Sequence, residues 1–108
     1  MSCDSQAEEL LLFMKGLNRL LVITGAGCST GSGISDYRDD KGSWKIAAPI
    51  QHQDFLKSVI ARKRYSFRSQ LGFPSFRDAQ PNQAHLVLAR LEEQGVVDAL
   101  ITQNVDRL

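Results

Sequence analysis

Two clusters of small and polar residues, far apart in the chain, have the composition of a nucleotide-binding site. The first follows the apolar run 20–24 and reads Gly25-Ala26-Gly27-Cys28-Ser29. Glycines at the end of a buried strand let the backbone approach a phosphate without a Cβ in the way. The second follows the short apolar run 99–102 and reads Gln103-Asn104-Val105-Asp106. If both runs are strands of one sheet, the two clusters lie together at the carboxyl ends of the strands and outline a nucleotide cleft.

The glycine spacing disfavours two common phosphate-binding patterns. Gly-x-Gly-x-x-Gly would need a glycine at Thr30, whereas Gly31 comes one residue late. A second strand ending in an acidic residue about 20 residues further on is also missing. A P-loop would need Gly-Lys-Ser/Thr, which does not follow. An independent module of dehydrogenase type is therefore disfavoured, and taken alone the glycine turn is equally compatible with a tight turn that binds no ligand.

The first elements that must position these clusters are a helix and a strand. Ser5 and Glu8 form a capping-box pattern ahead of apolar residues that share a helix face. This pattern predicts a helix over 6–15 that ends near Gly16 and packs on a sheet as a cover. The run 20–24 predicts a strand buried on both faces, as in parallel sheets.

The later elements complete a crossover unit. Residues 25–49 predict a long loop with one helical turn, and 53–70 a helix that Gly72 and Pro74 close. A second helix opens at 81–82, ends at Gly95 and leads into a strand over 99–102. A strand, helices and a strand in this order predict parallel pairing and a right-handed crossover. The predicted fold class is α/β, part of a Rossmann-like parallel sheet with covering helices.

Composition and charge limit the number of domains and the classes of binding partner. The 108 residues, 43% of them hydrophobic, allow one domain or part of one. A net charge of +1 gives no strong field toward nucleic acid or a membrane, and no apolar run has the roughly 20 residues that span a bilayer. The basic, aromatic-rich stretch 57–77 is better explained as a solvated helical cover of the cleft than as a nucleic-acid patch.

Cysteine usage and the amino-terminal charge indicate the compartment. Cys3 and Cys28 have neither the number nor the spacing of a disulfide framework or a zinc site, which fits a reducing compartment. Asp4, Glu8 and Glu9 stand where a presequence would be basic. We therefore expect no metal site in this chain and a cytoplasmic protein.

Four motifs together resemble the sirtuins, the NAD-dependent protein deacylases. Besides the two clusters above, they are Gly33-Ile34-Ser35-Asp36-Tyr37-Arg38 and Pro81-Asn82-Gln83-Ala84-His85. The motifs occur in the family's order and at family-like spacing, and the resemblance covers residues 20–108. The stretches 49–55 and 64–76 resemble the class that contains the mitochondrial lipoamidase type and its bacterial relatives. This class makes the mitochondrial matrix the alternative localisation.

The resemblance implies that NAD is the cofactor and assigns three groups of residues to it. The residues that lie against the NAD phosphates are Gly25, Ala26, Gly27 and Ser29. The residues that line the nicotinamide pocket are Gly33, Ile34, Asp36, Tyr37 and Arg38. The residues that reach the nicotinamide ribose and the nicotinamide are Gln103, Asn104, Val105 and Asp106. A carboxylate such as Asp36 can accept a hydrogen bond from the carboxamide N–H₂. The family's proline is Ser35 here, which removes a fixed φ and loosens the loop.

The resemblance also implies which parts of the family's machinery lie beyond this sequence. In the family mechanism the acyl-lysine carbonyl oxygen attacks the ribose as nicotinamide leaves, and a histidine acts as general base on a ribose hydroxyl. That histidine, the paired cysteines that hold zinc, and the later strands all follow the position of Leu108. His52 and His85 are expected to be structural, so we predict no catalytic residue in this chain.

The resulting hypothesis is that residues 1–108 are the amino-terminal portion of a sirtuin-type deacylase domain. This portion binds NAD and is inactive by itself, and an acyl-lysine protein is a partner only when the domain is complete. The alternative is a non-catalytic or interfering product that binds NAD or pairs with a full-length relative. An unfinished parallel sheet has an exposed edge, and such edges favour self-association.

Overall fold

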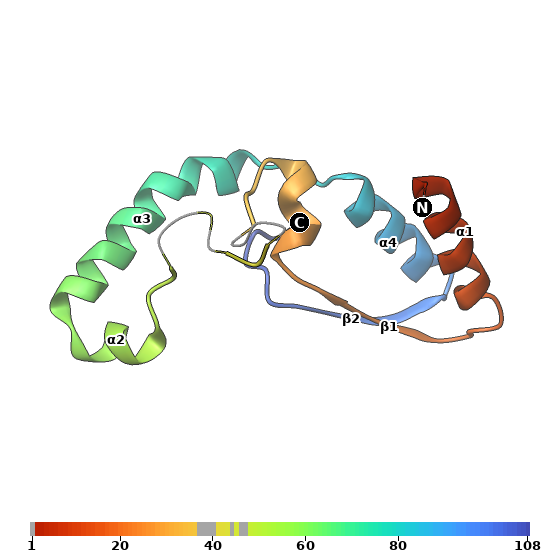
Figure 1. Cartoon of the computed structure of the whole chain (residues 1–108), viewed down its shortest axis with the longest axis horizontal. Helices are drawn as coiled ribbons and strands as arrows, with labels where there is room; N and C mark the ends of the chain where they lie inside the picture. The colour runs from red at the N-terminus through yellow and green to blue at the C-terminus, as the bar shows by residue number, and fades with distance from the viewer. Residues whose placement is uncertain (1, 37–40, 44, 46–47) are drawn as a thin grey trace.

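The computed structural model describes residues 2–36, 41–43, 45 and 48–108. The chain alternates helices and strands (Figure 1). In order, the elements are α1 (Cys3–Met14), β1 (Leu20–Thr24), the 3-10 helix η1 (Ala26–Ser32), α2 (His52–Lys57), α3 (Val59–Asp78), α4 (Gln83–Glu93) and β2 (Val97–Thr102).

The two strands pair in parallel, which confirms the predicted α/β class. Thr24 lies opposite Thr102, so the carboxyl ends of β1 and β2 lie side by side. β1 has the predicted bounds, whereas β2 begins at Val97 rather than at residue 99. The earlier start follows from pairing, because the Leu20 N–H donates to the Val96 carbonyl at 2.9 Å.

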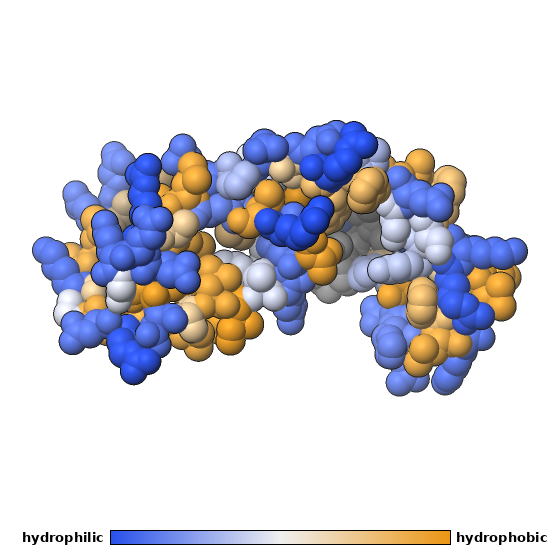
Figure 2. Space-filling model, turned by 180° about the vertical axis from the view of Figure 1, so that it is seen from behind, coloured by the Kyte–Doolittle hydropathy of each residue, from blue (hydrophilic) through white to orange (hydrophobic). Residues whose placement is uncertain are grey.

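One face of this sheet is covered and the other is open. Among the described residues, α4 is the helix that packs on β2, and Val97 beneath it is 4% exposed. Leu21 and Ile23 of β1 are 60% and 73% exposed. The prediction that β1 is buried on both faces is therefore wrong. Figure 2 shows apolar residues gathered on the surface of the half that holds α1, α4 and the sheet.

The first helix starts earlier than predicted. The Ser2 hydroxyl accepts a hydrogen bond from the Ser5 N–H at 3.3 Å, so α1 is capped at Ser2 and begins at Cys3. Ser5 lies inside the first turn, where its hydroxyl donates to the Ser2 carbonyl at 2.8 Å. None of the described side chains of α1 is buried, and Phe13 is 71% exposed. The expected packing of this helix as a cover of the sheet is not observed.

The middle of the chain forms a helical hairpin rather than one helix. Ser58 separates α2 from α3, and its hydroxyl caps α3 by accepting from the Ala61 N–H at 3.2 Å. The Arg62 guanidinium of α3 donates to the Phe55 carbonyl of α2 at 2.9 Å. The predicted stop at Gly72 and Pro74 is wrong, because α3 continues through both to Asp78.

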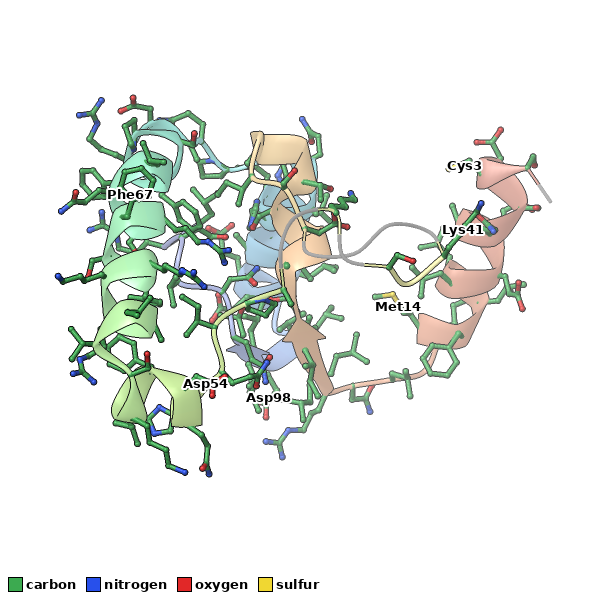
Figure 3. The ribbon with its side chains drawn as sticks, turned by 60° about the vertical axis from the view of Figure 1, so that its left-hand side comes forward. Cys3, Met14, Lys41, Asp54, Phe67 and Asp98 are labelled. Atoms are coloured by element: carbon green, nitrogen blue, oxygen red, sulfur yellow. The ribbon has the colours of Figure 1, made fainter. Side chains whose placement is uncertain are left out.

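The helical hairpin extends away from the sheet (Figure 1). Phe67 of α3 is 62% exposed and projects from the helix in Figure 3. The radius of gyration is 17.4 Å, compared with about 13 Å for a compact domain of this length. No described helix is both long and apolar enough to cross a membrane.

Candidate functional site

The candidate site forms where the two strands end. η1 begins directly after β1, and the polar segment 103–106 follows β2. The Asn104 Nδ2 donates to the Gly25 carbonyl at 2.9 Å, which joins the two strand ends. The backbone at this residue is held locally, because the Asn104 N–H donates to the Thr102 hydroxyl at 3.0 Å. The parallel pairing of Thr24 with Thr102 brings these groups within reach of one another.

A buried serine makes a second bond between the strand ends. Ser29 is 1% exposed, and its hydroxyl donates to Asp106 Oδ2 at 2.6 Å. The Asn104 Nδ2 lies 3.4 Å from the same hydroxyl, which can accept from it. The Leu108 N–H donates to Asp106 Oδ1 at 3.0 Å. Both carboxylate oxygens of Asp106 therefore accept a hydrogen bond from the chain.

These contacts keep the Asp106 carboxyl ionised. Partial burial alone would raise its pKa. The hydrogen bonds from the Ser29 hydroxyl and the Leu108 N–H outweigh burial and lower the pKa of Asp106. At neutral pH the site therefore presents a fixed negative charge beside the Asn104 amide.

The glycine turn leaves space where a ligand would lie. A Cβ added at Gly25 or Gly27 would meet no described atom within 4 Å, and neither residue has a positive φ. Neither the turn nor packing within the described chain therefore requires glycine at these two positions. Gly33 is different, because its φ of 85° ends η1 in the left-handed region. Open space over Gly25 and Gly27 fits a turn that receives a ligand from outside.

A cavity of about 260 Å³ lies beside the strand ends. Residues of β1, η1, α4, β2 and the carboxyl-terminal segment line it. Its polar lining includes Thr24, Cys28, His85, Thr102, Asn104 and Asp106. This volume lies just below the range of about 300–1,000 Å³ that is typical of ligand pockets.

The other candidate residues are not gathered at the strand ends in the same way. The Asp36 carboxylate, which the resemblance assigns to the nicotinamide pocket, is paired with the Lys45 ammonium. Gln103 is exposed, and Val105 is 80% exposed. The backbone of Ile34 joins the turn, because its N–H donates to the Ser29 carbonyl at 3.3 Å. The candidates Tyr37 and Arg38 lie outside the described residues.

The start of α4 contributes contacts that the sequence did not predict. The Asn82 Nδ2 donates to the Cys28 carbonyl at 2.8 Å and to the Ser32 hydroxyl at 3.1 Å. The sequence showed Asn82 only as the opening of a helix. An asparagine cap is nevertheless a usable signal, because capping uses its oxygen and leaves the Nδ2 donors for another segment.

His85 is bonded within the fold, as predicted. Its Nδ1 accepts from the Asn82 N–H at 3.1 Å and completes the capping box of α4. A neutral His85 therefore carries its proton on Nε2, which lies 4.0 Å from the Cys28 sulfur. His52 lies in the first turn of α2, away from these contacts.

Parallel strands with a glycine turn after one and an amide-carboxylate cluster after the other are typical of nucleotide-binding α/β proteins. Within that class, the Sir2 family model matches residues 25–108. The chain belongs to the Sir2 family.

Curated relatives agree with this assignment. The chain is 54% identical over 104 residues to an NAD-dependent protein deacetylase of Bordetella pertussis, a match that covers 96% of this chain and 38% of the relative. It is 46% identical to the mitochondrial NAD-dependent protein lipoamidase sirtuin-4 of Bos taurus, with 95% and 34% of the two chains covered. The predicted resemblance to the lipoamidase type and its bacterial relatives is confirmed. The chain spans well under half the length of these relatives.

Solved Sir2 structures share the fold. A Sir2 complex with a p53 peptide and NAD⁺ matches with a TM-score of 0.71 and 35% identity over 94% of this chain and 39% of the other. A Sir2 structure bound to an acetylated peptide matches with a TM-score of 0.69 and 34% identity over the same fractions. The sheet and its helices therefore form part of the Rossmann-like Sir2 fold.

Proposed function

We propose that residues 1–108 are the NAD-binding portion of a Sir2-type protein deacylase domain. The observation that carries this proposal is the pair of hydrogen bonds that join the segments after the two strands. Ser29 bonds Asp106 and Asn104 bonds Gly25, so an open glycine turn is held beside an amide and an ionised carboxylate. Relatives named NAD-dependent deacetylases and a Sir2 complex with NAD⁺ support the choice of ligand.

The proposed contacts follow from the chemistry of each group. Gly25, Ala26, Gly27 and Ser29 lie against the phosphates, where no Cβ of either glycine stands in the way. Asn104 and Asp106 serve the nicotinamide ribose as donor and acceptor. Asp36 accepts from the carboxamide once it leaves Lys45. NAD supplies the ribose carbon that takes the acyl oxygen when nicotinamide departs, and an acyl-lysine protein is the proposed second substrate of the whole domain.

The 108-residue polypeptide alone is expected to bind NAD without consuming it. His85 Nδ1 is occupied by the Asn82 N–H and His52 lies in α2, so neither is placed as a general base at the strand ends. We expect the purified chain, mixed with NAD and an acetyl-lysine peptide, to release nicotinamide at the rate of the protein-free blank. The Bordetella pertussis relative serves as the positive control. Sustained release by the pure chain would contradict this expectation.

The two cysteines provide a direct test of NAD binding. Cys28 lines the cavity, whereas Cys3 is exposed on α1, away from the strand ends (Figure 3). A ligand that covers Cys28 lowers its alkylation rate in proportion to the fraction of protein left free, so the rate falls about tenfold at ten times the Kd. We expect NAD to slow modification of Cys28 and to leave the rate at Cys3 unchanged, as read by peptide mass spectrometry. Unchanged rates at both cysteines under saturating NAD would refute the proposed function.

A further inference from the structure

The glycine turn is held by two side-chain amides that come from different elements. Asn104, after β2, donates its Nδ2 to the Gly25 carbonyl at 2.9 Å. Asn82, at the start of α4, donates its Nδ2 to the Cys28 carbonyl at 2.8 Å. One amide therefore fixes the first peptide group of the turn, and the other fixes a peptide group in its middle.

The Asn82 side chain is fully committed to this arrangement. Its Nδ2 also donates to the Ser32 hydroxyl at 3.1 Å, and its Oδ1 accepts from the Ala84 N–H at 2.9 Å. Gly31 packs directly against it, because a Cβ added there would lie 3.3 Å from the Asn82 Nδ2. Glycine at this position is explained by the close approach of η1 to Asn82.

Fixing a carbonyl also fixes the amide beyond it. The peptide group is planar and trans, so its C=O and N–H point in opposite directions. When Asn82 holds the Cys28 carbonyl, the N–H of Ser29 is directed away from Asn82. A carbonyl turned toward a phosphate would repel it, whereas an N–H turned toward it would attract it. By holding a peptide group in the middle of η1, the Asn82 amide fixes the orientation of η1 and so the direction of the N–H groups at its start, which the turn can offer to an anion.

We propose that Asn82 is a positioning residue for the cofactor turn, and this inference rests on the proposed NAD-binding function. Asn82 acts through the Cys28 and Ser32 contacts and does not itself contact the cofactor. Its role is separable from helix capping, because the cap uses Oδ1 and the turn uses Nδ2.

The Asn82→Asp variant separates these two roles. Aspartate keeps the capping oxygen and is as good an N-cap as asparagine, but its ionised form has no hydrogen to donate. We expect the melting temperature without ligand to fall by several degrees, because the Cys28 carbonyl and the Ser32 hydroxyl lose their donor while the helix cap is kept. We expect the Kd for NAD, measured by calorimetric titration, to rise about tenfold, as loss of one such bond implies. Asn82→Ser keeps a cap and one hydroxyl donor and should give an intermediate Kd.

Two controls exclude simpler causes. The Asn82→Asp change adds a negative charge, whose direct effect on NAD would shrink at high salt, whereas the effect of a misplaced carbonyl would persist. Ser58→Ala removes the cap of α3, distant from the site, and is expected to lower the melting temperature with the Kd unchanged.

The outcomes distinguish this inference from the proposed function. A wild-type chain that does not bind NAD overturns the proposed function and the positioning role with it. A wild-type chain that binds, with an Asn82→Asp variant of equal Kd, overturns the positioning role alone. Equal weakening by Asn82→Asp and Ser58→Ala also overturns it, because general destabilisation then explains both. A tenfold loss of affinity confined to the Asn82 variants, with the Kd of Ser58→Ala unchanged although its melting temperature is lowered, supports it.

Discussion

We expect the Gly27→Val variant to lose NAD affinity by about a hundredfold while melting at nearly the same temperature as the wild type. A Cβ at Gly27 would meet no described atom of the chain within 4 Å, and the residue has no positive φ. Valine is also no poorer a helix former than glycine. The described chain therefore leaves the space at the Cβ free, and the added side chain is expected to clash chiefly with a ligand that lies against the turn. Titration calorimetry and thermal melts measure the two quantities separately.

A graded series and a matched control sharpen this prediction. Gly27→Ala adds a single methyl group and should give a smaller loss of affinity than Gly27→Val. Ala99→Val adds apolar bulk at an exposed position of β2, away from the strand ends, and should leave the Kd unchanged. Wild-type affinity in Gly27→Val would show that the cofactor does not contact this turn.

The elements that could be predicted are those with strong local signals at their ends. β1 has the predicted bounds because an apolar run stops at Gly25. α4 starts and stops as expected because Asn82 caps it and Gly95, with a φ of 75°, ends it. Where two signals compete, the sequence does not decide between them. Ser2 and Ser5 are both suitable caps, and the structure uses Ser2.

Tertiary contacts override local signals elsewhere. Pro74 should end a helix, yet α3 continues past it, while the break falls at Ser58, where Arg62 folds α2 back onto α3. An apolar strand predicts burial on both faces, but α4 covers one face only and Leu21 stays exposed. Such outcomes depend on which elements meet in space, which periodicity does not encode.

The candidate site could also be predicted from the sequence only in part. The sequence predicts that the clusters at Gly25 and Asn104 meet, because parallel strands bring their carboxyl ends to one edge. It does not predict which atoms pair. The pairing of Asp36 with Lys45 and the contact of Asn82 with the Cys28 carbonyl depend on loop and helix placement. The residue types predicted the chemistry of the site, whereas the pairing of individual atoms is known only from the folded structure.

The bond between Ser29 and Asp106 should stabilise the fold as well as the site. Ser29 is 1% exposed and donates to an ionised carboxylate, and such bonds contribute about 1.5–3 kcal/mol. We therefore expect Ser29→Ala to lower the melting temperature by about 10 °C at pH 7. The Asp106→Asn variant and the double variant complete a cycle in which the coupling free energy should be about 1–2 kcal/mol.

The pH dependence of this coupling identifies its origin. Because the pKa of Asp106 is lowered in the folded chain, its contribution is fully present above the unfolded-state pKa of about 3.9 and is lost as the pH falls through the folded value. The difference in melting temperature between wild type and Ser29→Ala should therefore shrink below about pH 4. Asp78→Asn removes a carboxylate whose pKa is also lowered, by exposed Arg77, and should change stability little at any pH. A Ser29→Ala effect that stays constant with pH would place the role of Ser29 in packing rather than in its bond to the carboxylate.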